Sequence, residues 1–201
     1  MQILSSNQIP LWLKLSYTVF VFGLIPIYWK QYGPANFLWF SDIALLTIVA
    51  ALWLESSLLT SMMALAVVLL DVAWNVDFFT RLTVGKSVTG LGAYMFDPKI
   101  SRTIRAISLF HIVFPLLLLW MLHRLGYDSR ALIAQTLLAW VVLPLTYLFR
   151  NSSTENINWI RGFGNKPQQS LPAHLHLILL MILFPLIIYL PSHFLFRWIF
   201  G

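Results

Sequence analysis

The stretch SLFHIVFPLLLLWMLHRLGY, residues 108–127, decides which class of fold this chain can adopt. From residue 109 to residue 122 it is apolar except for one imidazole, that of His111. An apolar segment of about 20 residues is long enough to cross the hydrocarbon core of a bilayer as a helix. The stretch therefore predicts a membrane-spanning helix that holds a titratable side chain where an unpartnered polar group is poorly tolerated.

The composition of the whole chain agrees with this prediction. Of the 201 residues, 59% are hydrophobic and 10% are charged, and the mean hydropathy is +0.79, whereas soluble domains average about 25% charged residues. The absence of cysteine excludes disulfides, thiolate catalysis and thiolate metal sites. The net charge of +6 comes from basic residues between the apolar segments, which indicates contact with lipid headgroups and not with nucleic acid.

Six segments are long and apolar enough to cross the membrane. They cover residues 9–29, 37–55, 57–79, 103–123, 130–149 and 173–198. Because lipid offers no partner for backbone amides, each segment must be a helix. The predicted fold class is therefore all-α: a polytopic integral membrane protein with a bundle of about six transmembrane helices, forming a single domain over residues 1–201.

Two longer connections carry most of the remaining polar residues. Residues 80–102 mix glycines with aromatic residues and are expected to lie along the membrane interface or to re-enter it, and residues 150–172 form a polar loop before the last helix. Nine of the 13 basic residues fall on the side of the long loops: Lys30, Arg81, Lys86, Lys99, Arg102, Arg105, Arg150, Arg161 and Lys166. The positive-inside rule places that side in the cytoplasm, and we expect a multi-pass protein of a bacterial inner membrane or its equivalent.

Polar side chains within the predicted helices gather in one leaflet. Counting about 1.5 Å per residue from the long-loop surface places Ser41 and Asp42 roughly 6–8 Å deep, and Asp71 and His111 about 12 Å deep. Asn75 follows Asp71 by four residues and shares its helix face. Two carboxylates, an amide, a hydroxyl and an imidazole at similar depth predict a shared intramembrane site.

This set of side chains supports more than one chemistry. A histidine beside a hydroxyl and a carboxylate permits general-base activation of the hydroxyl, so the candidate catalytic residues are His111, Ser41, Asp42 and Asp71. The candidate substrate-binding residues are Asn75, Trp39 and Asn158. Without the hydroxyl, the same groups would relay protons or hold a divalent metal, and each alone would serve as a hydrogen-bonding contact between helices. The sequence itself predicts no cofactor and no metal site.

Three other polar residues have simpler interpretations. Asp77 is turned away from Asp71 on its helix and is expected to extend its carboxylate toward the surface. His174 and His176 are two residues apart, so they lie on different helix faces. They are interpreted as interfacial residues and not as joint metal ligands.

Three segments in this order resemble a known family. FLWFSDIALL (37–46), the stretch at 108–127 and NINWIRGFGNKP (156–167) are similar to landmarks of the androgen-induced, FAR-17a-type transmembrane lipid hydrolases and the related bacterial integral membrane acyltransferase-like proteins. The resemblance spans Asn36 to Pro191. It implies a six-helix bundle that hydrolyses or transfers acyl esters.

The resemblance also assigns roles to particular positions. It makes His111, with Pro115 four residues later, the catalytic histidine. The nucleophile of the hydrolases is a threonine, which falls on Trp39, and that of the acyltransferase-like branch is a cysteine, which falls on Ser41. Trp39 cannot act as a nucleophile, so this sequence departs from the hydrolase pattern, and Ser41 is the remaining candidate.

Three functions stay open at this level. The first is an intramembrane enzyme that acts on a lipid ester, with the membrane lipid as its partner. The second is a non-catalytic small membrane subunit of a larger complex, or a protein that binds lipid or pigment. The third is a proton-coupled transporter that uses Asp42, Asp71 and His111 as a relay.

Overall fold

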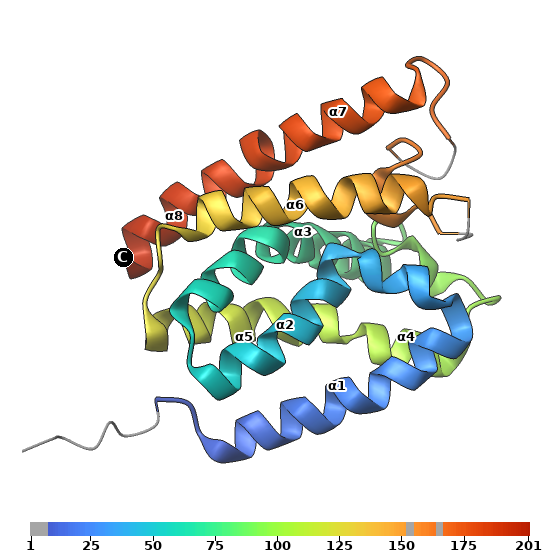
Figure 1. The fold of residues 1–201 in the computed structure, drawn as a ribbon. Helices are drawn as coiled ribbons and strands as arrows, with labels where there is room; N and C mark the ends of the chain where they lie inside the picture. Colours follow the sequence, from blue (N-terminus) through green and yellow to red (C-terminus); the bar gives the residue numbers. More distant parts are fainter. Residues whose placement is uncertain (1–7, 152–154, 164–166) are drawn as a thin grey trace, which may run out of the picture.

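The computed structural model describes residues 8–151, 155–163 and 167–201, and every regular element in those ranges is helical (Figure 1). The longer helices are α1 (Leu11–Tyr32), α2 (Phe40–Leu54), α3 (Ser57–Val84), α4 (Arg102–Ser108), α5 (Phe110–Leu125), α6 (Ala131–Leu148), α7 (Ala173–Leu183) and α8 (Leu190–Phe200). The shorter elements are the 3₁₀ turns η1 (Pro34–Leu38), η2 (Ala93–Phe96) and η3 (Ile157–Trp159), and the π-helical segment η4 (Phe184–Tyr189). The predicted polar loop at 150–172 is thus described only in part, and Lys166 lies outside the described residues.

The all-helical architecture is confirmed. Five spans are long and apolar enough to cross a membrane, and α2 is a shorter apolar helix of 15 residues. Two of the spans consist of consecutive segments: α4 with α5, which are separated at Leu109, and α7 with η4 and α8. The protein thus has the dimensions and the apolar outer surface of a multi-pass membrane protein.

Two helix boundaries differ from the prediction for a local reason. The second helix begins at Phe40 and not at residue 37, because Pro34 starts a 3₁₀ turn whose last hydrogen bond runs from the Trp39 amide to the Asn36 carbonyl. The third helix continues to Val84, where Gly85 ends it with a positive φ of 76°, a conformation that glycine adopts without steric cost. The connection after α3 is therefore shorter than residues 80–102.

Helix α3 lies at the centre of the bundle. It packs against α2, α5 and α6, while α1 covers α2 on one flank and α7 covers α6 on the other (Figure 1). In its most apolar window 56% of the residues are buried, compared with 22% in the last span. A central helix is the best-shielded place for polar side chains, and α3 carries Asp71, Asn75 and Asp77.

Proline residues interrupt several helices, and one interruption is repaired from a neighbouring helix. Pro185 has no N–H, so the carbonyl of Met181, four residues earlier, loses its helical partner. The indole Nε1 of Trp140 in α6 donates to that carbonyl at 2.9 Å. Side-chain donors of this kind allow proline inside membrane helices.

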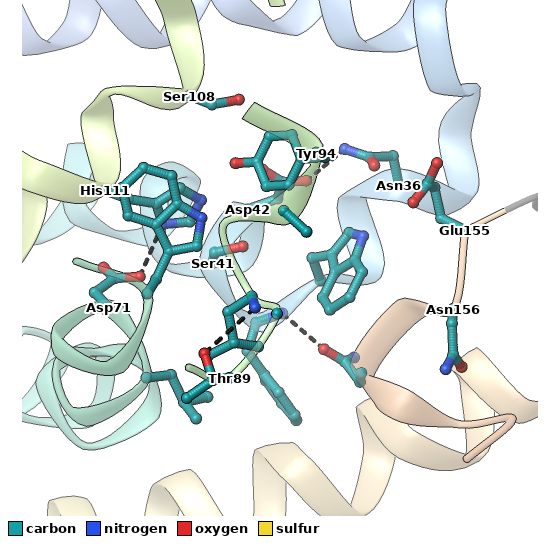
Figure 2. A pocket seen from close by; sticks show the side chains of 18 of the residues that line it. Asn36, Ser41, Asp42, Asp71, Thr89, Tyr94, Ser108, His111, Glu155 and Asn156 are labelled. Atoms are coloured by element: carbon teal, nitrogen blue, oxygen red, sulfur yellow. Dashed lines mark hydrogen bonds and ion pairs between the residues drawn. The ribbon is translucent and has the colours of Figure 1, made fainter. Parts of the chain in front are cut away.

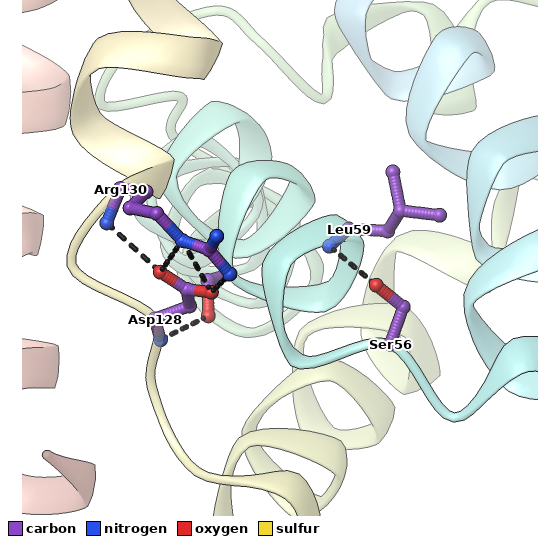
Figure 3. A network of polar contacts seen from close by, with 5 residues as sticks. Ser56, Leu59, Asp128 and Arg130 are labelled. Atoms are coloured by element: carbon purple, nitrogen blue, oxygen red, sulfur yellow. Dashed lines mark hydrogen bonds and ion pairs between the residues drawn. The ribbon is translucent and has the colours of Figure 1, made fainter.

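The end of the bundle with short connections is held by polar contacts (Figure 3). Ser56 caps α3 by accepting from the Leu59 amide at 3.3 Å, and Ser61 Oγ accepts from the Asp128 amide at 2.9 Å, which ties the loop between α5 and α6 to α3. Asp128 also binds the Arg130 guanidinium at 2.6 Å. That guanidinium holds the pKa of the Asp128 carboxyl below its usual value.

The start of the described chain is fastened at the same end. Glu55, between α2 and α3, accepts from the amides of Gln8 and Ile9 and from Lys14 Nζ, the last at 2.8 Å. The contact with Lys14 is the main cause that lowers the pKa of the Glu55 carboxyl. These contacts hold α1 against the α2–α3 hairpin, at the opposite end of the bundle from the long connections.

Candidate functional site

A cavity of about 860 Å³ lies where the long connections gather (Figure 2). Its walls come from α1, α2, α3 and α5, the connection after α3, and the residues around η3. Six of the seven predicted site residues line this one cavity: Trp39, Ser41, Asp42, Asp71, His111 and Asn158. The structure therefore brings together Ser41, Asp42, Asp71 and His111, for which the sequence predicted a similar depth, and it also places Trp39 and Asn158 in the same wall.

His111 and Asp71 form a hydrogen-bonded pair between α5 and α3. His111 Nδ1 lies 2.8 Å from Asp71 Oδ1, and the two side chains are 15% and 4% exposed. The Trp74 ring stacks on the imidazole with its centroid 5.0 Å away. With Asp71 ionised, its carboxylate only accepts, so the proton of a neutral imidazole lies on Nδ1 and the lone pair on Nε2. That is the tautomer of a general base.

The second ring nitrogen of His111 opens into the cavity. Nε2 has no hydrogen-bond partner among the described residues, and it is not one of their sealed, unpartnered polar atoms. The imidazole therefore offers an acceptor to whatever occupies the cavity.

Ser41 faces the same cavity from the first turn of α2 (Figure 2). Its hydroxyl makes no hydrogen bond to another described residue, and neither does the backbone amide of Ser41 or Asp42. Unpaired amides in a first helical turn carry partial positive charge and bind anions. Ser41 thus combines a free hydroxyl with adjacent donors for a developing negative charge.

Asp42 has a different partner from Asp71. Its Oδ2 accepts from Asn36 Nδ2 at 2.6 Å, and the carboxyl is 4% exposed. No hydrogen bond joins Asp42 to His111 in the described part of the chain. The two predicted carboxylates are thus not equivalent, and only Asp71 orients the imidazole.

Two amides predicted to contact substrate hold the framework of the site. Asn158 binds the backbone on both sides of Trp39: its Nδ2 donates to Leu38 O at 2.7 Å and its Oδ1 accepts from Phe40 N at 3.2 Å. Asn75 lies outside the cavity lining, and its Nδ2 donates to Asp71 O at 2.8 Å and His111 O at 2.7 Å. A direct contact with substrate stays a prediction for Asn158, while the Asn75 amide points at backbone.

Asp77 is the anchor of the connection between α3 and α4. Its Oδ1 accepts from Ser87 Oγ and from three consecutive backbone amides, at residues 88–90, at 2.7–3.0 Å. Its Oδ2 accepts from Gly92 N at 2.9 Å, and the residue is fully buried. The interpretation of Asp77 as a surface-seeking side chain is therefore wrong, because the loop folds back and encloses the carboxylate.

The anchored loop forms part of the cavity wall. Thr89, Gly90, Leu91 and Tyr94 all line the cavity. Burial raises the pKa of Tyr94 to about 12, so its hydroxyl stays protonated at neutral pH. The connection between α3 and α4 is thus an ordered wall of the cavity. The sequence identified it only as a glycine-rich segment near the interface.

The two histidines before the last span have different surroundings. His176 is buried and its Nε2 lies 3.0 Å from the Trp159 carbonyl oxygen, while His174 is exposed. His176 thereby connects the start of α7 to η3, which borders the cavity. An interfacial position stays a prediction for both residues.

Comparisons with known proteins identify no relative of this chain. No family model, no curated protein and no solved structure matches it. The resemblance to the transmembrane lipid hydrolases and the acyltransferase-like proteins therefore stays a prediction, and the function must be argued from the site itself.

Proposed function

We propose that this protein is a membrane-embedded enzyme that cleaves or transfers the acyl group of a lipid ester. Ser41 is the nucleophile, His111 the general base and Asp71 the residue that orients the imidazole. The observation that carries the proposal is the Asp71–His111 pair at 2.8 Å, with Nε2 open to the same cavity as the Ser41 hydroxyl.

The reaction follows from these positions. Ser41 Oγ attacks the ester carbonyl carbon while its proton passes to His111 Nε2, and Asp71 stabilises the imidazolium. The carbonyl oxygen becomes an oxyanion beside the free amides of Ser41 and Asp42. The intermediate collapses, the ester C–O bond breaks, and the leaving alkoxide takes the proton from Nε2. Water then releases the fatty acid from the acyl-serine, or a second alcohol takes the acyl group.

The walls of the cavity suit an amphiphilic substrate. Its volume of about 860 Å³ falls within the range of sites for small organic ligands. Ten of the lining residues are aromatic: Tyr28, Tyr32, Trp39, Phe40, Trp74, Tyr94, Phe96, Phe110, Trp159 and Phe184. The surrounding bundle exposes apolar side chains along its length, so a lipid is the ligand most available to this cavity.

Labelling by a fluorophosphonate probe tests the nucleophile. We expect the purified protein to be labelled and the Ser41→Ala variant to lose the label, because the probe reacts only with an activated serine. Ser108→Ala is the matched control, since Ser108 lines the same cavity but donates its hydroxyl to Ile104 O at 2.9 Å. Labelling that persists in Ser41→Ala, or disappears in Ser108→Ala alone, would refute the assignment.

A lipid-binding protein without catalysis is the second candidate. It is favoured by one observation: within the described residues, no hydrogen bond joins Ser41 Oγ to His111. Catalytic hydrogen bonds are often loose in a free enzyme, so this gap does not exclude the first candidate. Stoichiometric retention of lipid by an unlabelled, inactive protein would favour binding alone.

We further propose that the cavity opens toward the cytoplasmic side of the membrane. This rests on the excess of basic residues in the long connections. The chain has no cysteine, so a thiol reagent can label this protein only at an introduced cysteine, and the labelling shows on which side of the membrane that position lies. In intact cells, an impermeant maleimide should label Ser129→Cys and spare Lys86→Cys until the cells are lysed, both positions being exposed. The reverse pattern would invert the orientation.

A further inference from the structure

The carbonyl of His111 lacks its normal helical partner. In a regular α-helix the carbonyl of residue 111 accepts from the amide of residue 115, but residue 115 is proline and has no N–H. The proline ring also crowds the carbonyl four residues before it and tilts that carbonyl out of the helix. An unpaired backbone oxygen inside an apolar bundle is strongly unfavourable if nothing else binds it.

Asn75 supplies the missing donor from the neighbouring helix. Its Nδ2 lies 2.7 Å from His111 O and 2.8 Å from Asp71 O. Both partners are carbonyl oxygens, which only accept, so the amide nitrogen must face them, and its two N–H groups are both used. Asn75 Oδ1 is buried with no partner in the described part of the chain. All the hydrogen bonds of the Asn75 side chain to described residues thus go to these two carbonyl groups.

We infer that Asn75 is a positioning residue that sets the geometry of the Asp71–His111 pair. It joins the backbones of the same two residues whose side chains meet at 2.8 Å. The amide substitutes for the helical hydrogen bond that Pro115 removes, so it fixes the position of the His111 backbone relative to α3. Only the effect on turnover rests on the proposed function, whereas the structural coupling stands independently of it.

The last span provides an internal comparison. Pro185 has no N–H for the Met181 carbonyl, and Trp140 Nε1 donates to that carbonyl at 2.9 Å. The site is similar to that at Pro115, but Pro185 lies in the π-helical segment η4, and Met181 and Trp140 do not line the cavity. The bundle therefore offers a matched proline at which a substitution leaves the His111 carbonyl unchanged.

The test is suppression of one substitution by another. Asn75→Leu keeps the branching of the side chain and removes the donor, and Pro115→Ala returns an N–H to the helix. We expect Asn75→Leu to weaken the Nδ1 hydrogen bond in the ¹⁵N spectrum of the His111 ring, assigned against His111→Gln, and to slow probe labelling by roughly tenfold to a hundredfold. Asn75→Leu combined with Pro115→Ala should recover most of both, and Asn75→Leu combined with Pro185→Ala should recover neither.

Each outcome decides the inference. An unchanged His111 spectrum in Asn75→Leu, or equal recovery with Pro115→Ala and Pro185→Ala, overturns it. If Asn75→Leu does not fold, Asn75→Ser replaces it, because its one hydroxyl donates to one carbonyl at a time. If the spectra change and recover as expected while no variant is labelled, the positioning role holds and the proposed catalysis fails.

Discussion

Replacing Asp71 with asparagine is expected to reduce lipid-ester turnover by about 10⁴-fold while the fold is kept. The asparagine can present its NH₂ group to His111 Nδ1, and the imidazole then carries its proton on Nε2. In that tautomer the nitrogen that faces the cavity is no longer an acceptor, so it cannot take the proton of Ser41. The rate of turnover at saturating substrate, with the folded state checked by circular dichroism, measures the loss.

The Asp42→Asn variant is the control for this substitution. Asp42 lies in the same cavity and is as buried as Asp71, but it binds Asn36 and not the imidazole. We expect Asp42→Asn to reduce the rate of turnover about 100-fold less than Asp71→Asn does, because it leaves the tautomer of His111 unchanged. Equal losses in the two variants would contradict the role given to Asp71.

Replacing Asp77 with alanine is expected to release the connection between α3 and α4. The substitution removes the acceptor of five hydrogen bonds, four of them from backbone amides at residues 88–90 and 92. Part of this loss is regained from water, so we expect the stability to fall by about 2–4 kcal/mol. Hydrogen exchange at these four amides should become fast, and ligand retention should fall because the loop forms a wall of the cavity.

The control for the anchor is Ser87→Ala. It removes one of the five contacts to Asp77 and also the contact in which Ser87 Oγ accepts from the Gly90 amide at 3.0 Å. All four amide contacts to the carboxylate stay in place, so exchange at residues 88, 89 and 92 should change little. If Asp77→Ala leaves exchange at residues 88–90 as slow as in the unaltered protein, the carboxylate does not hold the loop.

The fold was predictable because hydrophobicity alone determines it. Segments of about 20 apolar residues must become helices in a bilayer, and six such segments in 201 residues leave no room for another architecture. Their ends were harder to predict. The start of α2 depends on the 3₁₀ turn at Pro34, and the end of α3 on the left-handed backbone of Gly85, and both are local backbone choices that hydropathy does not detect.

The sequence predicted which residues belong to the candidate site, but not which carboxylate binds the imidazole. Depth along each helix placed Ser41, Asp42, Asp71 and His111 in one layer, and the structure brings all four to one cavity. Rotation of the helices about their axes decides which carboxylate meets the imidazole. Without that rotation the sequence left Asp42 and Asp71 equivalent.

Contacts between a helix and a loop could not be predicted either, because they also depend on how the elements are arranged in space. Nothing in the sequence connects Asp77 to amides 11 to 15 residues later, because those contacts depend on how the loop returns to the bundle. The bridge from Asn75 could have been predicted. Pro115, four residues after His111, leaves the His111 carbonyl without a helical donor, and an amide side chain on a neighbouring helix can donate to it.

Under the proposed function, the short length of α2 sets the depth at which a membrane lipid and water would meet at Ser41. A helix of 15 residues extends about 22 Å, less than the roughly 30 Å of a hydrocarbon core. If its far end reaches the opposite surface, its first turn, with Ser41, begins below the layer of headgroups. A membrane lipid would then meet Ser41 by lateral diffusion, without leaving the bilayer. Water has the longer route, and for hydrolysis the polar mouth of the cavity would have to conduct it inward.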